Sequence, residues 1–297
     1  MEKEEVKTKV KNIERVIAPP TPHMVGDGFR MHGFIPNVHG LSMKRMDPFI
    51  VLDYGSKFYF PPSDKLRGVG VHPHKGFETV TISYKGSVAH NDSSGSGGVI
   101  HEGDVQWMTA GNGVLHKEFH EENFSKQGGD FHVVQLWVNL PAKYKRTKPK
   151  YQAIPSTEIK NHILPNEAGQ VDIIAGAYQK TEGPASTFTP IHLFNAKIKA
   201  GKSADFSFPD HYSTFMIVIE GNIKVNGVEV PLNHFVLMEK EGENFTIEAK
   251  DDAIVLVASG EPIEEPIAAH GPFVMNTEQE LIEAFNDFNL GRFGYLE

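Results

Sequence analysis

The sequence contains no cysteine among its 297 residues. Without thiolates, neither a disulfide framework nor a cysteine-ligated zinc or iron–sulfur site can form, so any metal must be held by histidine and carboxylate side chains. Basic residues are in the minority, with 29 lysines and arginines against 38 acidic residues. Because the net charge is −9 and the only basic cluster is the short stretch "KYKRTKPKYQ", we expect no direct binding to nucleic acid.

Long apolar runs are also missing. No run approaches the ~18 residues that a membrane-spanning helix needs. The chain starts with "MEKEEVKTKVKN", which is charged throughout and has no apolar region like that of a signal peptide. We therefore expect a soluble cytoplasmic protein, a monomer, with no membrane partner.

What is present favours β-structure. The chain has 28 glycines and 19 prolines, and these separate short segments such as "ETVTISYKG", in which apolar and polar residues alternate. The segment "STFMIVIEGNIKVNG" has the same layout as "FETVTISYKGSVAHN", which predicts a duplicated β-barrel. A basic, proline-bearing linker between the repeats places the predicted domains at residues 1–148 and 149–297.

One helix is predicted, at the C-terminal end. In "MNTEQELIEAFNDFNLGRFG", Asn276 or Thr277 can cap a helix over residues 277–290, and glutamates follow in its first turn. Leu281, Ala284 and Phe285 then share one face, and Gly291 ends the helix.

Two pairs of potential metal ligands occur at strand spacing. His72 and His74 are two residues apart in "GVGVHPHKG", and His116 and Glu118 are two apart in "VLHKEFH". Side chains two apart on a strand point to the same face, so two such strands can present three imidazoles and a carboxylate to one point. Such a set suits iron, nickel, copper, zinc or manganese. The spacing alone leaves a second carboxylate open, because Glu78 has the same parity as His72 and His74.

The remaining histidines lack a second converging pair. We expect four of them to be hydrogen-bonded or surface residues, namely His90, His101, His120 and His132. In the second half, His211 and His234 each stand alone, so the second domain is predicted to carry no metal site.

Several motifs, taken in order along the chain, together resemble the pirin family. They are "DPFIVLD", "HPHKGFETVTI", "AHND", "GDVQWMTAGNGVLHKE", "QLWVNLP", "GEPIEEPIAAHGPFVMNT" and "GRFG". The resemblance implies an all-β fold of two tandem cupin barrels, which are jelly-roll-like, with a C-terminal helix. It also implies one divalent metal in the first barrel, held by His72, His74, His116 and Glu118, and so favours Glu118 over Glu78. The stretch "GDGFRMHGF" departs from the family pattern near the N-terminus, which affects the entrance to the site.

The same resemblance implies quercetin 2,3-dioxygenase activity, in which O2 opens the heterocycle of a flavonol with loss of carbon monoxide. Iron is the first expectation for the metal, with nickel, copper, zinc, manganese or cobalt as alternatives. Glu118 would act as a catalytic base as well as a ligand. Four residues, Phe49, Phe77, Trp107 and Met108, could line a flat aromatic substrate or could belong to the core. The alternative function is that of a metal-bearing, redox-sensing regulator that binds a transcription factor or a metabolic enzyme.

Overall fold

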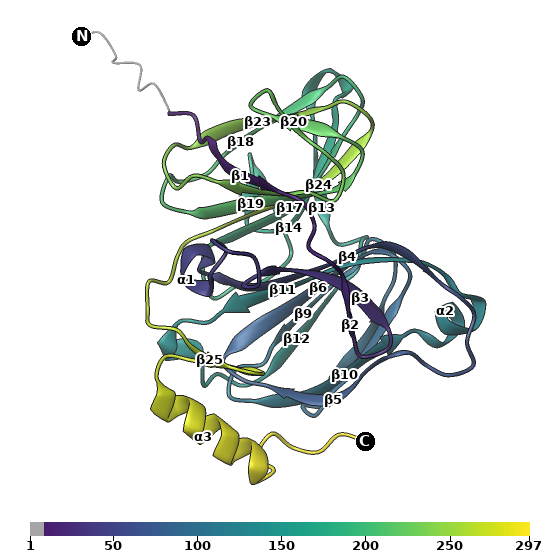
Figure 1. Ribbon diagram of the computed structural model, residues 1–297, viewed down its shortest axis with the longest axis vertical. Coiled ribbons are helices and arrows are strands. Elements are labelled where there is room, and N and C mark those ends of the chain that lie inside the picture. The colour runs from purple at the N-terminus through teal and green to yellow at the C-terminus, as the bar shows by residue number, and fades with distance from the viewer. Residues whose placement is uncertain (1–8) are drawn as a thin grey trace. The chain divides into compact units, whose positions relative to one another are not determined.

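The computed structural model describes residues 9–297, and these residues pack into two units built mainly of antiparallel strands (Figure 1). We call the unit made of Pro20–Ile159, Ala185–Thr189 and Ile263–Glu297 the N-terminal barrel. We call the unit made of residues 9–19, Lys160–Pro184 and Pro190–Pro262 the C-terminal barrel. The predicted all-β fold of two barrels with a C-terminal helix is confirmed.

The two units are interleaved along the chain, since each is made of three separate segments. The division into a metal-binding domain of residues 1–148 and a metal-free domain of residues 149–297 stays a prediction. Most of the charged stretch at the start of the chain lies outside the described residues.

The N-terminal barrel is formed by two antiparallel sheets. The strands of the larger sheet are β2 (His23–Val25), β3 (Phe29–Ile35), β4 (Phe49–Phe60), β6 (Phe77–Lys85), β9 (Val105–Thr109), β11 (Gly129–Asn139) and β12 (Lys150–Ile154). They lie in the order β12-β9-β6-β11-β4-β3-β2. The strands of the smaller sheet are β5 (Gly68–His74), β7 (Val88–Asp92), β8 (Gly97–Ile100) and β10 (Val114–His120), in the order β5-β10-β7-β8.

Strand β6 shows why the alternating pattern indicates a strand but not which side faces the barrel interior. Its polar parity points inward, because the Thr81 hydroxyl donates to Glu118 on β10 of the opposite sheet. Its apolar parity is buried as well, with Val80 and Ile82 at most 1% exposed. The inner face of β6 therefore contributes hydroxyl groups to a polar interior.

The C-terminal segment packs against the strands that carry the predicted ligands. It contains β25 (Ala268–His270), β26 (Phe273–Met275) and α3 (Glu278–Asn289). Two glycines permit the close approach, because a Cβ at Gly76 would lie 2.0 Å from the Val274 carbonyl oxygen and one at Gly113 would lie 2.2 Å from the Phe293 ring. Both glycines have positive φ, of 90° and 117°, which other residues rarely adopt.

Helix α3 confirms the predicted helix almost to the residue. Thr277 is its N-cap and forms a capping box with Glu280. Its apolar face, with Leu281 and Ala284, packs into a cluster with Phe273 and Phe293. The short helices α1 (Met43–Met46), α2 (Glu122–Gln127) and η1 (Ala142–Tyr144) were not predicted, because segments this short carry no helical periodicity.

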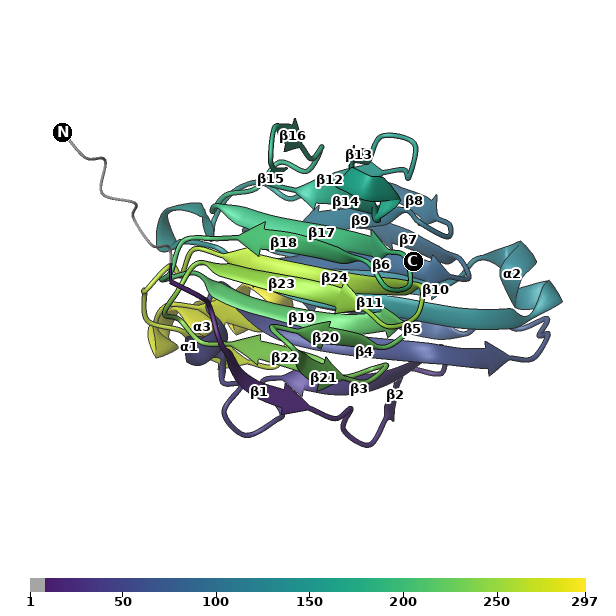
Figure 2. The same cartoon turned by 90° about the horizontal axis from the view of Figure 1, so that it is seen from above.

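The C-terminal barrel also consists of two main sheets, which lie one in front of the other in Figure 2. One contains β1 (Ile13–Ile17), β13 (Lys160–Ile163), β14 (Gly169–Ala175), β17 (Ile191–Ile198), β19 (Ser213–Glu220), β22 (Phe235–Met238) and β24 (Ala253–Gly260). The other contains β18 (Ser203–Ser207), β20 (Ile223–Val225), β21 (Val228–Val230) and β23 (Asn244–Ala249). A hairpin of β15 (Ala177–Tyr178) and β16 (Thr181–Glu182) follows β14, and the turn η2 (Pro165–Glu167) precedes it.

The first strand of the chain belongs to this second barrel. Strand β1 pairs with β22, which lies at the other end of the sequence, and is the purple strand beside it in Figure 2. Just before it, the Lys11 ammonium is buried and donates to the carbonyl oxygens of Asp210, Glu239 and Lys240. The core between the sheets is an apolar cluster that includes Phe194, Phe206, Met216, Val236 and Phe245.

No helix among residues 9–297 is long and apolar enough to cross a membrane.

Candidate metal centre

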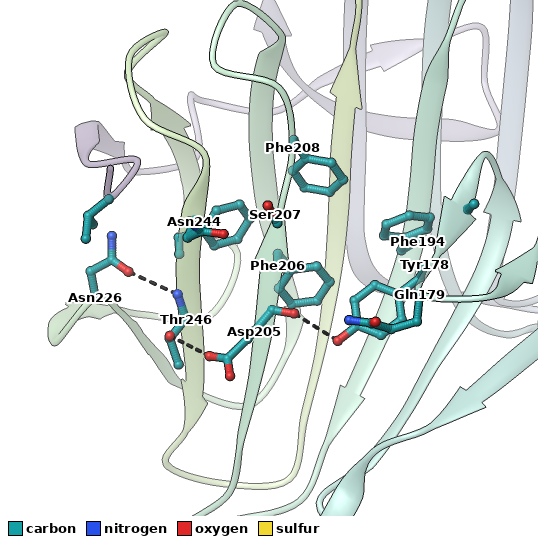
Figure 3. A pocket seen from close by; sticks show the side chains of 13 residues that line it. Tyr178, Gln179, Phe194, Asp205, Phe206, Ser207, Phe208, Asn226, Asn244 and Thr246 are labelled. Carbon is teal, nitrogen blue, oxygen red and sulfur yellow. Dashed lines mark hydrogen bonds between the residues drawn. The ribbon is translucent and has the colours of Figure 1, made fainter. Parts of the chain in front are cut away.

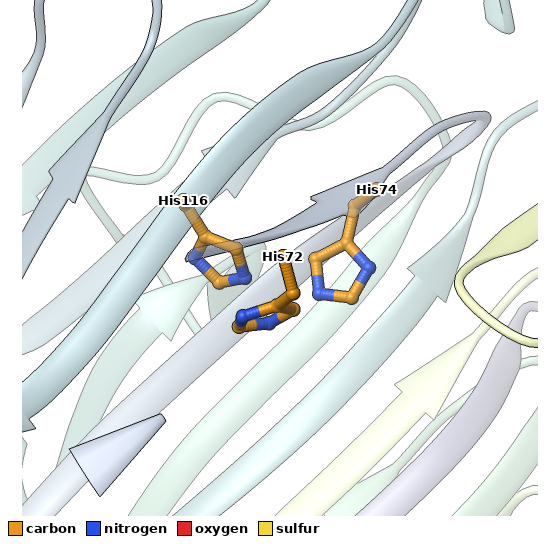
Figure 4. Close-up of side chains that lie close together, drawn as sticks. All are labelled: His72, His74 and His116. Carbon is orange, nitrogen blue, oxygen red and sulfur yellow. The ribbon is translucent and has the colours of Figure 1, made fainter. Parts of the chain in front are cut away.

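Three imidazoles converge in the N-terminal barrel, from two neighbouring strands. Strands β5 and β10 are antiparallel, with His116 opposite His72 and Val114 opposite His74. The ring centroids lie 4.2 Å apart for His72 and His116, 4.7 Å for His74 and His116, and 4.9 Å for His72 and His74. Each ring can turn one nitrogen toward the space between them, and these nitrogens lie within 4.8 Å of one another (Figure 4). We call these three residues the histidine triad.

Two histidines of the triad, His74 and His116, favour the neutral form, which offers a lone pair. Burial, followed by the neighbouring imidazoles, holds the pKa values of His74 and His116 well below the ordinary value for histidine. His72 is partly exposed, and its Nδ1 donates to the Gly70 carbonyl oxygen at 2.8 Å, which leaves the lone pair on Nε2. Nε2 of His116 is buried and has no hydrogen-bond partner among the described residues. A buried nitrogen without a partner beside two more imidazoles fits a divalent metal ion.

The fourth predicted ligand, Glu118, lies two residues after His116 on β10. A register shift separates it from His116 in the pairing with β5, so Glu118 faces Val69 there. It is 4% exposed and forms a second group of possible ligands with His116 and His90. The structure thus brings His72, His74 and His116 together in one group, and joins Glu118 to that group through His116.

The Glu118 carboxylate is held by donors from three strands of the opposite sheet. Oε1 accepts from the Gln106 side-chain amide on β9 and from the Thr81 hydroxyl on β6. Oε2 accepts from the Gln135 amide on β11 at 3.1 Å. These contacts fix the carboxylate inside the barrel, and none of the three donors can readily accept a proton from it.

Glu78, the other carboxylate that the spacing allowed, lies elsewhere. It is 1% exposed and accepts a hydrogen bond of 2.7 Å from the Thr109 hydroxyl. Burial raises the pKa of Glu78 to about 7, against the effect of that hydrogen bond. It belongs to neither group of possible metal ligands found among the described residues.

A histidine that the sequence did not single out lies beside the triad. His90 was expected to have no converging partners, but its Nδ1 lies 3.4 Å from Nδ1 of His116. Its other nitrogen, Nε2, lies 3.2 Å from Oδ2 of Asp92, and its ring stacks on Tyr151 at 16° and 4.9 Å. Burial acts to raise the pKa of Asp92, but hydrogen bonds from His90, Ser94 and Ser96 outweigh it and lower that pKa.

The H-x-D spacing of His90 and Asp92 indicates that their side chains share a face of the sheet, and in the pairing with β10 this is the face of His116 and Glu118. Three other histidines are hydrogen-bonded as expected. His101 contacts the Ser87 hydroxyl, His120 the Gly28 carbonyl oxygen and His132 the Tyr54 hydroxyl.

The four residues proposed to line an aromatic substrate are all at most 1% exposed. Phe77 lies next to the triad, with its ring 5.0 Å from that of His74 and stacked on Trp137. Trp107 has the opposite parity to Gln106, so its ring points away from the Glu118 carboxylate. Met108 packs with Ala110 and Val114. Of the four, Phe77 is the one that a ring contact places against a triad histidine.

The C-terminal barrel has a cavity of about 610 Å³, with a wall of Phe194, Phe206, Phe208 and Phe245 and a polar rim that includes Asp205 and Thr246 (Figure 3). No histidine among residues 9–297 lines it. His211 lies beside Asp210 and Glu261, and His234 contacts the Leu232 carbonyl oxygen. Neither residue belongs to a group of three possible metal ligands within residues 9–297.

Comparison with known proteins gives consistent matches over nearly the whole chain. The profile of the Pirin family matches residues 26–138, and that of the Pirin C-terminal cupin domain matches residues 193–294. A protein of Pseudomonas aeruginosa, named as a candidate quercetin 2,3-dioxygenase, is 43% identical over 272 residues, which are 91% of this chain and 94% of that protein. Pirin-1 of Arabidopsis thaliana is 36% identical over 264 residues, or 86% of each chain.

Solved structures agree with these matches. The crystal structure of a quercetin 2,3-dioxygenase from Acinetobacter baumannii has a TM-score of 0.91 and 43% identity, and the match covers 97% of this chain and all of that one. A bacterial pirin from Escherichia coli, solved in complex with nickel(II), has a TM-score of 0.63 over 84% of this chain and 99% of its own. Its identity is 17%, so this likeness concerns the fold alone.

Proposed function

The chain belongs to the pirin family, and from that premise we propose that it is a metal-dependent dioxygenase of the quercetin 2,3-dioxygenase type. The observation that carries the proposal is the histidine triad, whose three imidazoles converge while a buried nitrogen of His74 and one of His116 have no hydrogen-bond partner among the described residues. The 43% identity to a protein with this activity in its name supports the same conclusion.

In this proposal His72, His74 and His116 hold one divalent transition metal, and Glu118 is the carboxylate of the site. When bound, such a metal supplies a Lewis acid for the substrate hydroxyl and a redox partner for O2. Iron is our first candidate, while nickel, copper, zinc, manganese and cobalt remain compatible with imidazole and carboxylate ligands.

Glu118 is the residue that would take the proton of the flavonol 3-hydroxyl. It adjoins the triad through His116, and its closest hydrogen-bond partners are amides and a hydroxyl, which do not compete for that proton. The amides of Gln106 and Gln135 hold the carboxylate in place while it changes charge. His72 is the most exposed residue of the triad, so we expect the substrate to approach on that side, with Phe77 and His74 forming the inner wall.

The decisive experiment is flavonol turnover. The metal-free protein is loaded in turn with each divalent metal, and the loss of quercetin's visible absorbance is followed together with the release of carbon monoxide. We expect turnover that depends on the loaded metal and on O2, and none with the metal-free protein as the control.

If no metal supports turnover of any flavonol, the dioxygenase proposal is wrong. The regulator that binds a transcription factor or metabolic enzyme then takes precedence, because the same ligands serve that function.

A further inference from the structure

A chain of polar contacts leads from Asp92 through His90 to the triad. The three side chains are 5%, 1% and 0% exposed for Asp92, His90 and His116, so no bulk water competes for their hydrogen bonds. They lie on adjacent strands, because Asp92 is opposite His116 and His90 is opposite Glu118 in the pairing of β7 with β10. The stack on Tyr151 fixes the plane of the His90 ring.

The order of donors along this chain is set by Asp92. Its Oδ1 accepts from the Ser94 backbone N–H at 2.8 Å, the Ser94 hydroxyl at 2.6 Å and the Ser96 backbone N–H at 3.2 Å. Its Oδ2 faces Nε2 of His90 at 3.2 Å, and a carboxylate can only accept. His90 therefore donates from Nε2, and in a ring with one proton this leaves Nδ1 with the lone pair.

That lone pair faces His116. Because Nδ1 of His90 can only accept, Nδ1 of His116, 3.4 Å away, carries the proton of that ring. The lone pair of His116 is then on Nε2, the buried nitrogen without a partner. From these contacts we propose that Asp92 and His90 are positioning residues that hold His116 in the tautomer able to bind a metal through Nε2.

This inference rests on the proposed function, because it assigns the two residues a purpose at the same metal centre. Its test differs from that of the proposed function, because the tautomer of His116 can be measured in the metal-free protein. Replacing a residue that orients a metal-ligating histidine commonly lowers metal affinity by about 10-fold to 100-fold.

The informative variant is Asp92→Asn, because the loop decides how the new amide is oriented. The two backbone N–H groups of Ser94 and Ser96 can only donate, so the amide oxygen takes the place of Oδ1 and the NH2 group faces His90. The NH2 group donates to Nε2 of His90, whose proton must then be on Nδ1. His116 in turn must accept at Nδ1 and carry its proton on Nε2, so each ring keeps one proton and the order of donors is inverted.

The tautomer is measured by 15N NMR of histidine-labelled, metal-free protein, with the His116 signals assigned from the spectrum of His116→Gln. We expect an Nδ1-protonated His116 in the wild type and an Nε2-protonated one in Asp92→Asn. Zinc, a redox-inactive probe, should bind Asp92→Asn about 10-fold to 100-fold more weakly in a chelator competition.

Two further variants distinguish the positioning role of Asp92 and His90 from a loss of local structure. Asp252→Asn is a control, because Oδ1 of Asp252 also accepts from a backbone N–H, that of Ala200, and the residue is exposed, so the amide oxygen can keep this bond while the NH2 group faces solvent. We expect it to leave the His116 tautomer and the zinc affinity unchanged. In His90→Phe the ring can still stack on Tyr151 but cannot accept from His116, and we expect weaker binding of zinc with one ion per chain retained.

The outcomes distinguish the two proposals. If the wild type shows the Nδ1-protonated His116 but binds no zinc, the positioning of His116 by Asp92 and His90 is supported and the proposed metal centre is wrong. If zinc binds the wild type, but Asp92→Asn keeps both the wild-type tautomer of His116 and the zinc affinity, the proposed positioning role is wrong and the proposed metal centre is supported. If, in addition, His90→Phe loses all zinc, His90 is itself a ligand.

Discussion

At the scale of single residues, two buried glutamates of the N-terminal barrel differ in surroundings and in expected role. Glu118 accepts hydrogen bonds from three strands of the opposite sheet and adjoins the triad, whereas Glu78 accepts from Thr109 and belongs to neither group of possible metal ligands among the described residues. Their side chains are chemically identical, so the matched substitutions Glu118→Gln and Glu78→Gln test environment alone.

Glu118→Gln should separate metal binding from catalysis. The amide is nearly isosteric but hardly basic, so we expect most of the metal to be retained and flavonol turnover to fall by about 100-fold or more. His116→Ala is the contrasting variant, in which metal affinity falls first and activity is lost as a result. Metal content by elemental analysis and turnover are measured on the same samples. Full metal and full activity in Glu118→Gln, with both lost in Glu78→Gln, would make Glu78 the carboxylate of the site.

Glu78→Gln should change how stability depends on pH. The pKa of Glu78 is about 7 in the folded protein against 4.5 ordinarily, so the folded state keeps its proton where the unfolded state has lost it. The stability that the protonated group contributes is therefore complete below pH 4.5, declines between pH 4.5 and 7, and is lost above pH 7. Between these limits the wild type should lose up to about 3 kcal/mol relative to the variant.

Urea unfolding of the metal-free proteins at pH 4.5, 6 and 8 measures this difference. Glu102→Gln is the control, because Glu102 is an exposed glutamate that pairs with Lys85. Parallel pH profiles for the wild type and Glu78→Gln would show that Glu78 titrates normally.

At the scale of elements, helix α3 is fastened directly beside the triad. Lys75, the residue after His74, is 1% exposed, and its ammonium lies 2.8 Å from Asp287 on the helix and 5.4 Å from the centre of the Phe293 ring. Removing one partner leaves a buried charge uncompensated, which makes such a pair costly to break.

We expect Asp287→Ala to lower the free energy of unfolding by about 3 kcal/mol. The control is Glu283→Ala on the same helix, whose partner Arg146 is half exposed, and it should cost less than about 1 kcal/mol. Thermal and urea unfolding give both values. Equal losses in the two variants would show that the Lys75 pair is not a special anchor of the helix.

The elements also show how far the sequence could predict the site. The convergence of His72, His74 and His116 followed from two pairs of residues at strand spacing, and helix α3 followed from its cap and its apolar face. The contact between His90 and His116 depends on the register of β7 against β10, and the donors to Glu118 come from the opposite sheet. Neither the register nor the choice of facing strands is encoded in a local pattern, so the sequence alone could place neither His90 beside His116 nor Gln135 beside Glu118.

At the scale of the whole molecule, the two barrels should differ in metal content. The N-terminal barrel contains the triad. In the C-terminal barrel, His211 lies beside Asp210 and Glu261, and His234 contacts the Leu232 carbonyl oxygen. Neither histidine belongs to a group of possible metal ligands within residues 9–297. Elemental analysis should therefore give about one metal per chain, and His211→Ala and His234→Ala should leave that ratio unchanged. Loss of metal in either variant would place a ligand in the C-terminal barrel.

The pairing of β1 with β22 also bears on how the chain folds as it is synthesised. Lys11, at the start of the C-terminal barrel, binds the Glu239 carbonyl oxygen 228 residues later, while the N-terminal barrel takes in Ile263–Glu297. The C-terminal barrel therefore lacks its last strand until Gly260 has been made, and the N-terminal barrel lacks its last strand until Met275 has been made. Until those later segments are made, strand β1 lacks its partner strand β22, and Lys75 lacks its ion-pair partner Asp287 on α3. The N-terminal barrel can thus be completed only after Ile263–Glu297 has been made, and a chain truncated before this segment leaves that barrel unfinished although every one of the proposed ligands is present.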